Sequence, residues 1–179
     1  MKDLLVIYHG NCADGFGAAW VVWNALGPEV EFFPGTYQSA PPDCTDRNVL
    51  MVDFSYKRPV IDMIAQVARS IVILDHHKSA KEDLEPFAVQ ECGEGRLAWA
   101  DIPSMLRDLE ELNRPPILAL FDMERSGAMI TWDVFNPGQK PPQLLRHIQD
   151  RDLWRFELEG TREIQAALFS YPYDFRTWD

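Results

Sequence analysis

The sequence predicts an α/β fold with a mostly parallel β-sheet flanked by helices, and it becomes more helical in its second half. Two observations lead to this expectation. In the first half, short apolar runs typical of buried strands alternate with segments of helical length and periodicity. Polar residues follow three of these runs where they end, as is typical of strands that meet a ligand-binding edge.

The first half contains four strand-like runs and two helical segments. The expected strands are residues 4–9, 29–35, 48–55 and 70–77, and the expected helices are residues 18–26 and 58–70. Gly27-Pro28 suits the end of the first helix, and Pro59 suits the first turn of the second. This rhythm is typical of parallel strands joined by helices.

The second half is expected to be largely helical. The helices predicted there are residues 104–112, 127–135, 141–154 and 161–170, and Ser126 is a candidate cap for the second of them. The longest predicted loop, residues 35–48, lies between two strands, and loops of this length are often functional.

Composition limits the classes of protein and partner. A chain of 179 residues with 46% apolar and 12% aromatic residues is expected to fold as one domain with a substantial core. Its formal net charge of −11, without a block of Lys or Arg, argues against a protein that grips long duplex DNA. A small phosphorylated substrate or a short single-stranded nucleic acid, held locally, remains compatible with this charge.

Neither a membrane location nor a secreted one is predicted. No apolar run approaches the roughly 20 residues needed to cross a bilayer, and the N-terminus lacks the features of a signal peptide. Cys12, Cys44 and Cys92 are widely spaced and contain no CxxC pair. This usage favours a reducing, cytoplasmic compartment over a disulfide framework or a cysteine-type zinc site.

Acids and histidines stand at the ends of three predicted strands. His9 and Asp14 follow the first strand, Asp53 lies near the end of the third, and Asp75-His76-His77 ends the fourth. In a parallel sheet these ends share one edge, which predicts a cluster. Single aspartates at such positions often cap turns, so the pattern alone leaves metal binding and capping open. Carboxylates with imidazoles suit Mn²⁺, Fe²⁺ or Zn²⁺.

Four ordered motifs carry a resemblance to a known family. The motifs are HGNCADGFGAA at 9–19, VDFS at 52–55, LDHH at 74–77 and IQDRD at 148–152, and RSGAM at 125–129 accompanies them. With these the chain resembles the catalytic domain of the DHH phosphoesterase superfamily. That superfamily includes RecJ-type exonucleases, nanoRNases, cyclic dinucleotide phosphodiesterases and manganese-dependent inorganic pyrophosphatases.

The resemblance implies one Rossmann-like, three-layer DHH catalytic domain over residues 1–179. We expect this chain to lack the C-terminal substrate-binding domain that usually follows in this superfamily, and to be either a stand-alone domain or a piece of a longer protein. The oligomeric state is left open, with a homodimer among the alternatives.

The resemblance also implies a site for two ions, Mn²⁺ first, with Mg²⁺ or another divalent ion as the alternative. The implied metal-binding residues are His9, Asp14, Asp53, Asp75, His76 and Asp150. Asp53 would bridge the ions, and Asp150 is preferred over Asp152. The implied catalytic residues are Asp75 and His77. Asp75 would support the first histidine, as carboxylates often do when they hydrogen-bond to a metal-binding imidazole, and His77 would face the substrate.

One residue departs from the family pattern. Cys12 stands where the first motif usually carries an aspartate. Either the first metal position is altered, which is the preferred interpretation, or the thiolate itself is a ligand and shifts the preference toward Zn²⁺ or Fe²⁺.

The expected function is therefore a Mn-dependent phosphohydrolase that cleaves a phosphodiester bond by a two-metal mechanism. The alternatives are a phosphoanhydride hydrolase of the pyrophosphatase kind and a non-catalytic DHH scaffold module. The density of titratable groups at strand ends argues against the scaffold.

Overall fold

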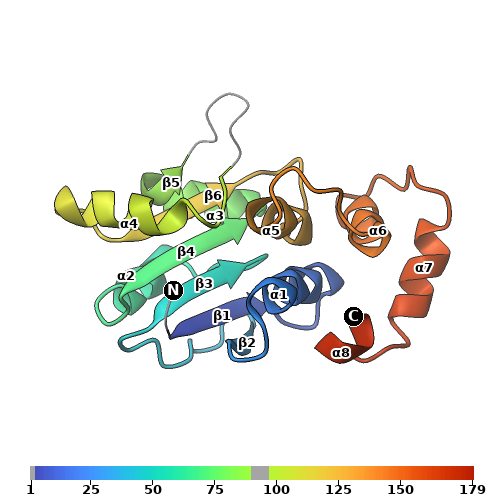
Figure 1. Ribbon diagram of the computed structural model, residues 1–179, viewed down its shortest axis with the longest axis horizontal. Helices are drawn as coiled ribbons and strands as arrows, with labels where there is room; N and C mark the ends of the chain where they lie inside the picture. Colours follow the sequence, from blue (N-terminus) through green and yellow to red (C-terminus); the bar gives the residue numbers. More distant parts are fainter. Residues whose placement is uncertain (1–2, 90–96) are drawn as a thin grey trace.

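The computed structural model describes residues 3–89 and 97–179 (Figure 1). In these ranges six strands form one all-parallel sheet in the order β2-β1-β3-β4-β6-β5. The strands are β1 (Leu4–His9), β2 (Glu31–Gly35), β3 (Asn48–Val52), β4 (Ser70–Asp75), β5 (Ala88–Val89) and β6 (Ile117–Phe121). The predicted α/β fold with a parallel sheet is confirmed.

Eight helices in the described residues surround this sheet. They are α1 (Ala13–Leu26), α2 (Arg58–Ile64), α3 (Lys78–Leu84), α4 (Ile102–Glu111), α5 (Gly127–Phe135), α6 (Gln143–Asp152), α7 (Thr161–Leu168) and α8 (Phe175–Trp178). The first helix starts five residues earlier than expected, so Asp14 lies in its first turn. Ser126 caps α5 as predicted, because its side chain accepts the backbone N–H of Met129.

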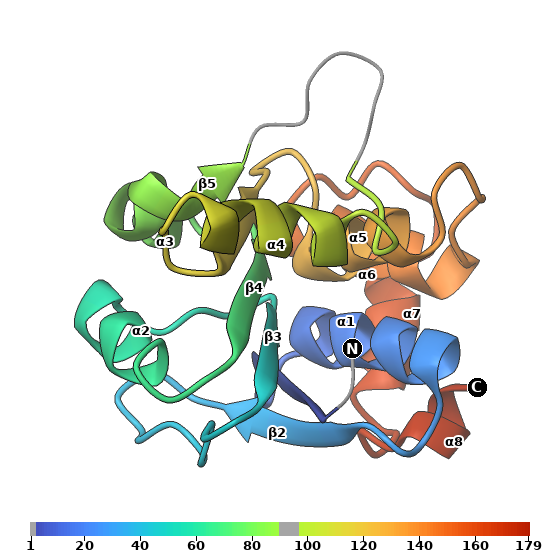
Figure 2. The same cartoon turned by 60° about the vertical axis from the view of Figure 1, so that its left-hand side comes forward.

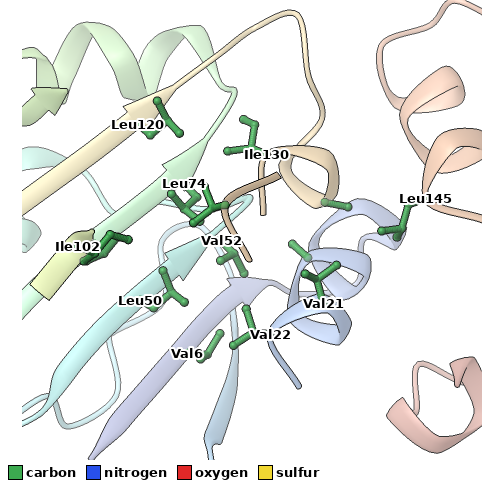
Figure 3. Packing of buried hydrophobic residues seen from close by; sticks show 14 of the residues in the cluster. Val6, Val21, Val22, Leu50, Val52, Leu74, Ile102, Leu120, Ile130 and Leu145 are labelled. Carbon is green, nitrogen blue, oxygen red and sulfur yellow. The ribbon is translucent and has the colours of Figure 1, made fainter. Parts of the chain in front are cut away.

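Two apolar layers fill the space between the sheet and its helices. Alternation along β1 sends Val6 to one face and Ile7 to the other. The first face packs against α1, α4, α5 and α6, and Figure 3 shows valines of α1 meeting the strands there. The second packs against α2 and α3, which lie across the sheet from α1 and α5 in Figure 2.

Strand β6 was not among the predicted elements. Its sequence, ILALF, is an apolar run of five residues after Pro115-Pro116, and periodicity cannot assign so short a run. In the fold it lies between β4 and β5 with all five residues buried. Burial on both faces of a parallel sheet explains the continuous apolar run.

The strand order places a topological switch point between β1 and β3. From β1 the chain crosses through α1 to β2 on one side, whereas from β3 it crosses through α2 to β4 on the other. Ligands of open α/β sheets bind in the crevice outside the carboxyl ends at such a point. The arrowheads of β1, β3 and β4 in Figure 1 point toward α1 and α5, so the carboxyl edge of the sheet faces these helices.

No helix within residues 3–89 and 97–179 combines the length and apolar character needed to cross a membrane. Cys12 and Cys44 carry free thiols, whereas Cys92 lies outside the described residues.

Candidate metal centre

Five predicted site residues lie along the carboxyl edge of the sheet. His9 ends β1, Asp53 follows β3, Asp75 ends β4 and His76 follows it. Asp14 reaches the same place from the first turn of α1. Since β1, β3 and β4 are neighbours in the sheet, residues far apart in the sequence meet at the switch point.

Asp53 stands at the centre of this cluster. Its φ is +54°, a left-handed conformation that aspartate tolerates better than most residues. Its Oδ2 lies 3.5 Å from His9 Nδ1 and its Oδ1 lies 3.1 Å from His76 Nε2. Nevertheless Asp53 Oδ1 and His9 Nδ1 are both buried without a well-oriented hydrogen bond to the described part of the chain. Such atoms are rare in folded proteins, and a cation would satisfy them.

Two groups of side chains could each hold a metal ion, and Asp53 belongs to both. In one group Asp53 stands with His9 and His77, and in the other with Asp14 and His76. Within each group the donor atoms lie within 4.8 Å of one another. A carboxylate shared in this way is suited to bridge two ions, and carboxylate with imidazole suits Mn²⁺ or a similar divalent metal.

The N-terminus of α5 holds the carboxylate of Asp14. Its oxygens accept the backbone N–H groups of Gly127 at 2.6 Å and Ala128 at 3.1 Å. Burial raises the pKa of Asp14 well above its usual range, and the charges of Asp53 and Asp152 raise it further. Several acids therefore crowd into one buried place, an arrangement that a divalent cation would stabilise.

The pKa of Asp53 moves the other way. Burial raises it, but the imidazoles of His76 and then His9 outweigh burial and hold the pKa at about 2. The bridging carboxylate is therefore ionised at neutral pH, which is the state that binds a metal.

Asp75 contacts both histidines that follow it: it holds the side chain of His77 and the backbone of His76, whereas the expectation was that it supports the first histidine and binds metal. Its Oδ1 lies 2.6 Å from His77 Nδ1 and accepts the backbone N–H groups of His76 and His77. Its Oδ2 accepts the Ser55 hydroxyl at 3.1 Å. Both oxygens of Asp75 accept hydrogen bonds, and its side chain is fully buried. The carboxylate is therefore suited to orient the His77 imidazole rather than to bind a metal.

His77 keeps one ring nitrogen for other partners. Hydrogen bonding to Asp75 raises its pKa despite partial burial, and 32% of the side chain is exposed. Because Nδ1 faces Asp75, Nε2 is the atom available for a substrate or a metal.

Asp152 contacts the cluster in this structure, whereas the sequence led us to prefer Asp150 as the ligand. Asp152 Oδ2 lies 3.4 Å from His76 Nε2. Asp150 instead accepts the backbone N–H groups of Glu157 and Leu158 and the hydroxyl of Thr161 at 2.6 Å. The chain after α6 folds back over Asp150 and engages both of its oxygens.

The two acids are expected to respond differently to neutralisation. Asp150→Asn should destabilise the fold by about 1–3 kcal/mol because it weakens three hydrogen bonds to a buried carboxylate. Asp152→Asn should leave the fold intact and weaken Mn²⁺ binding by about 10- to 100-fold. Urea unfolding measures the stability of both variants, and Mn²⁺ titration measures their metal affinity. If Asp150→Asn binds Mn²⁺ worse than Asp152→Asn does, this assignment of the acids is wrong.

Cys12 occupies the position before α1 and is half-buried. Its side chain contacts His9, but neither ligand group in the described residues includes it. The preference for an altered first position over a thiolate ligand stays a prediction.

Two residues at this site, Gly127 and Tyr37, are not among the predicted site residues. Gly127 packs so closely against Asp53 that a Cβ there would lie 2.3 Å from the Asp53 Cβ. In the sequence Gly127 belongs to the small-residue segment RSGAM, and that pattern does not by itself assign a role to the glycine. Tyr37, in the long loop after β2, lies with its ring centroid 5.3 Å from that of His9. Only the length of that loop pointed to it.

Metal affinity is expected to rise with pH. The contact with Asp53, and next that with Cys12, raises the pKa of His9 to about 10. In the metal-free chain the stabilisation from protonated His9 is complete below pH 6.5, the ordinary value, and is lost as the pH rises through about 10. A metal needs the neutral imidazole, so protons compete with it throughout this window.

Mn²⁺ titrations between about pH 6.5 and 8.5 measure this competition, with up to about tenfold tighter binding per pH unit for each proton displaced. His9→Gln should bind more weakly and with a shallower pH dependence. An unchanged slope in this variant would show that His9 is not the competing group.

No family model matches the chain, and no solved structure matches it. The chain is similar to the uncharacterized protein R106 of Acanthamoeba polyphaga mimivirus, with 29% identity over 191 residues. The match covers 98% of this chain and 39% of R106, so the chain spans about two fifths of the length of that relative.

Proposed function

We propose that this chain is a metal-dependent phosphoesterase of the DHH type. It hydrolyses a phosphodiester bond in a short oligonucleotide or nucleotide-like substrate with two divalent ions, Mn²⁺ first. The observation that carries the proposal is the shared carboxylate of Asp53, which stands between two potential ligand groups at the switch point. The ordered motifs that resemble the DHH superfamily support the same function.

The two ions would share Asp53 and differ in their other ligands. Asp53 with His9 would hold one, and Asp53 with Asp14 and His76 would hold the other, with Asp152 beside His76. When bound, such ions would lower the pKa of a water molecule and stabilise the charge that develops on the phosphoryl oxygens. The backbone N–H groups at the start of α5 fix Asp14 for this role.

His77 would handle the substrate. Asp75 fixes the ring through Nδ1 and favours its protonated form. The protonated Nε2 can donate a hydrogen bond to a phosphate oxygen or a proton to the leaving oxygen. Asp75 acts through His77 and is therefore a positioning residue.

Charge favours small substrates in this proposal. The net charge of −11 opposes binding of long duplex DNA, whose affinity depends on neutralising many phosphates. A short substrate needs only one phosphate at the metal centre, where the ions offset the surrounding acids.

The test is an assay of the purified chain loaded with Mn²⁺. The panel contains single-stranded dinucleotides to pentanucleotides, cyclic dinucleotides, bis(p-nitrophenyl) phosphate and pyrophosphate. We expect phosphodiester cleavage that stops when EDTA removes the metal and returns when Mn²⁺ is added back.

Two results would contradict the proposal in different ways. Cleavage of pyrophosphate alone would replace the phosphodiesterase with a phosphoanhydride hydrolase. Absence of both Mn²⁺ binding and turnover would favour a non-catalytic scaffold.

A further inference from the structure

A hollow of about 360 Å³ is lined in part by Tyr37, whose ring lies against His9 and His77 of the candidate metal centre. The residues that line it are Tyr37, Gln38, Ser55, Tyr56, Lys57, Ser79, Ala80 and Asp83. Its volume falls within the range of pockets that bind small molecules. The hollow mixes aromatic surface with hydroxyl and amide groups, a composition that suits a flat heterocycle carrying polar edges.

Tyr37 connects this hollow to the metal centre. Its ring centroid lies 5.3 Å from that of His9, 5.1 Å from that of Phe54 and 6.3 Å from that of His77. The side chain nevertheless remains 49% exposed. A large part of the ring therefore stays available to a ligand while its other contacts hold it against the histidines.

The turn that carries Tyr37 is held in place by its neighbours. The hydroxyls of Thr36 and Ser39 lie 2.7 Å apart, and the Ser39 N–H donates to the Thr36 carbonyl at 3.2 Å. Gln38 adopts a φ of +71°, a conformation that costs energy for a residue of this type. These contacts hold the turn in one conformation and keep Tyr37 next to the histidines, although Gln38 is strained.

Other groups around the hollow offer hydrogen bonds. The Tyr56 hydroxyl is buried and has no hydrogen-bond partner within residues 3–89 and 97–179. The Ser55 hydroxyl donates to Asp75, which in turn holds His77. Lys57 places an ammonium group at the exposed rim. Ser55 and Asp75 thereby connect the hollow to His77, the side chain that would contact the substrate phosphate.

We propose that this hollow binds a nucleobase of the substrate, with Tyr37 as the stacking surface and specificity-determining residue. The inference rests on the proposed function and narrows it to nucleotide substrates. A base against Tyr37 leaves its phosphate next to His9 and His77, because the same ring touches both histidines. Base–aromatic stacking is sequence-tolerant, so the pocket selects for a base rather than for one kind of base.

The first test compares two dinucleotides, one of which has an abasic residue at the end that would enter the hollow. Stacking contributes about 1–3 kcal/mol per base, or about 5- to 150-fold in kcat/KM. Tyr37→Ala should lower the ratio of kcat/KM for the complete substrate to that for the abasic one by this factor. Tyr37→Phe should restore the ratio. Tyr171→Ala, which removes a tyrosine with 57% exposure outside the hollow, serves as the matched control.

Equal losses on both substrates in Tyr37→Ala would overturn the base pocket and show that Tyr37 supports the metal centre instead. An unchanged ratio without any loss would overturn it as well.

The second test needs no turnover and no metal. Adenosine at millimolar concentration should give saturation-transfer NMR signals with the wild-type chain and with Tyr37→Phe, and none with Tyr37→Ala. Absence of signals with the wild-type chain would overturn the base pocket. If adenosine binds through Tyr37 but neither dinucleotide is cleaved with Mn²⁺ present, the pocket stands and the proposed phosphoesterase function fails.

Discussion

Replacement of Asp53 by asparagine is expected to abolish Mn²⁺-dependent turnover and to weaken both metal positions. The amide keeps the shape of the side chain but loses the charge that would join the two ions. Changes around metal ligands already cost 10- to 100-fold in affinity, so loss of a shared ligand should cost more than about 100-fold. Isothermal titration with Mn²⁺ and the phosphodiesterase assay measure the two effects separately.

Asparagine is preferable to alanine at this position because Asp53 has a φ of +54°. Asparagine tolerates the left-handed conformation, whereas a residue without a short polar side chain pays roughly 1–2 kcal/mol there. Asp46→Asn is the matched control, since Asp46 has a φ of +56° and is exposed. Normal Mn²⁺ binding in Asp53→Asn would contradict the assignment of Asp53 as the shared ligand.

The second large effect is expected from Gly127→Ala. A Cβ at Gly127 would lie 2.3 Å from the Asp53 Cβ and 2.6 Å from its Oδ1. Because the Asp53 Cβ is fixed to the backbone, the start of α5 must move away. The hydrogen bonds from Gly127 and Ala128 to Asp14 would then be disturbed.

This overpacking should destabilise the metal-free chain by about 1–3 kcal/mol, even though alanine is the better helix former. It should also weaken Mn²⁺ binding, because both Asp14 and Asp53 shift. Urea unfolding without metal and Mn²⁺ titration give the two values. Gly17→Ala is the control, since a Cβ added at Gly17 would meet only side-chain atoms of α5 and α6, at 3.3 Å or more. Wild-type stability and affinity in Gly127→Ala would show that the close contact does not constrain the site.

The parallel sheet and the meeting of the site residues could be predicted from the sequence. Buried parallel strands read as continuous apolar runs, and βαβ alternation brings their carboxyl ends to one edge. His9, Asp53 and His76 follow from that rule alone. Strand β6 could not be predicted because five apolar residues carry no distinguishing period.

The choice between Asp150 and Asp152 depends on tertiary structure. Both acids lie at the end of α6, and two residues of spacing place them on different faces without saying which face meets the site. The answer comes from the segment before α7, whose backbone and Thr161 engage Asp150. A backbone that folds back onto a helix end leaves no local signal in the sequence.

The hydrogen-bond partner of Asp75 could not be predicted from the sequence for a similar reason. Strand alternation indicated that Asp75, His76 and His77 would serve different roles, and they do take separate positions. After β4 the backbone turns and brings His77 Nδ1 to Asp75, while His76 reaches Asp53. The turn geometry decides this pairing, and the residue types alone do not.

The central claim is that Asp53 organises two metal ions, and the Mn²⁺ stoichiometry with the electron paramagnetic resonance spectrum of the loaded chain tests it most directly. Two ions per chain, held about 3.5–4 Å apart by a shared carboxylate, should give an exchange-coupled spectrum. The coupling should disappear in Asp53→Asn. One ion per chain or none, or two ions with the spectrum of isolated Mn²⁺, would contradict the account.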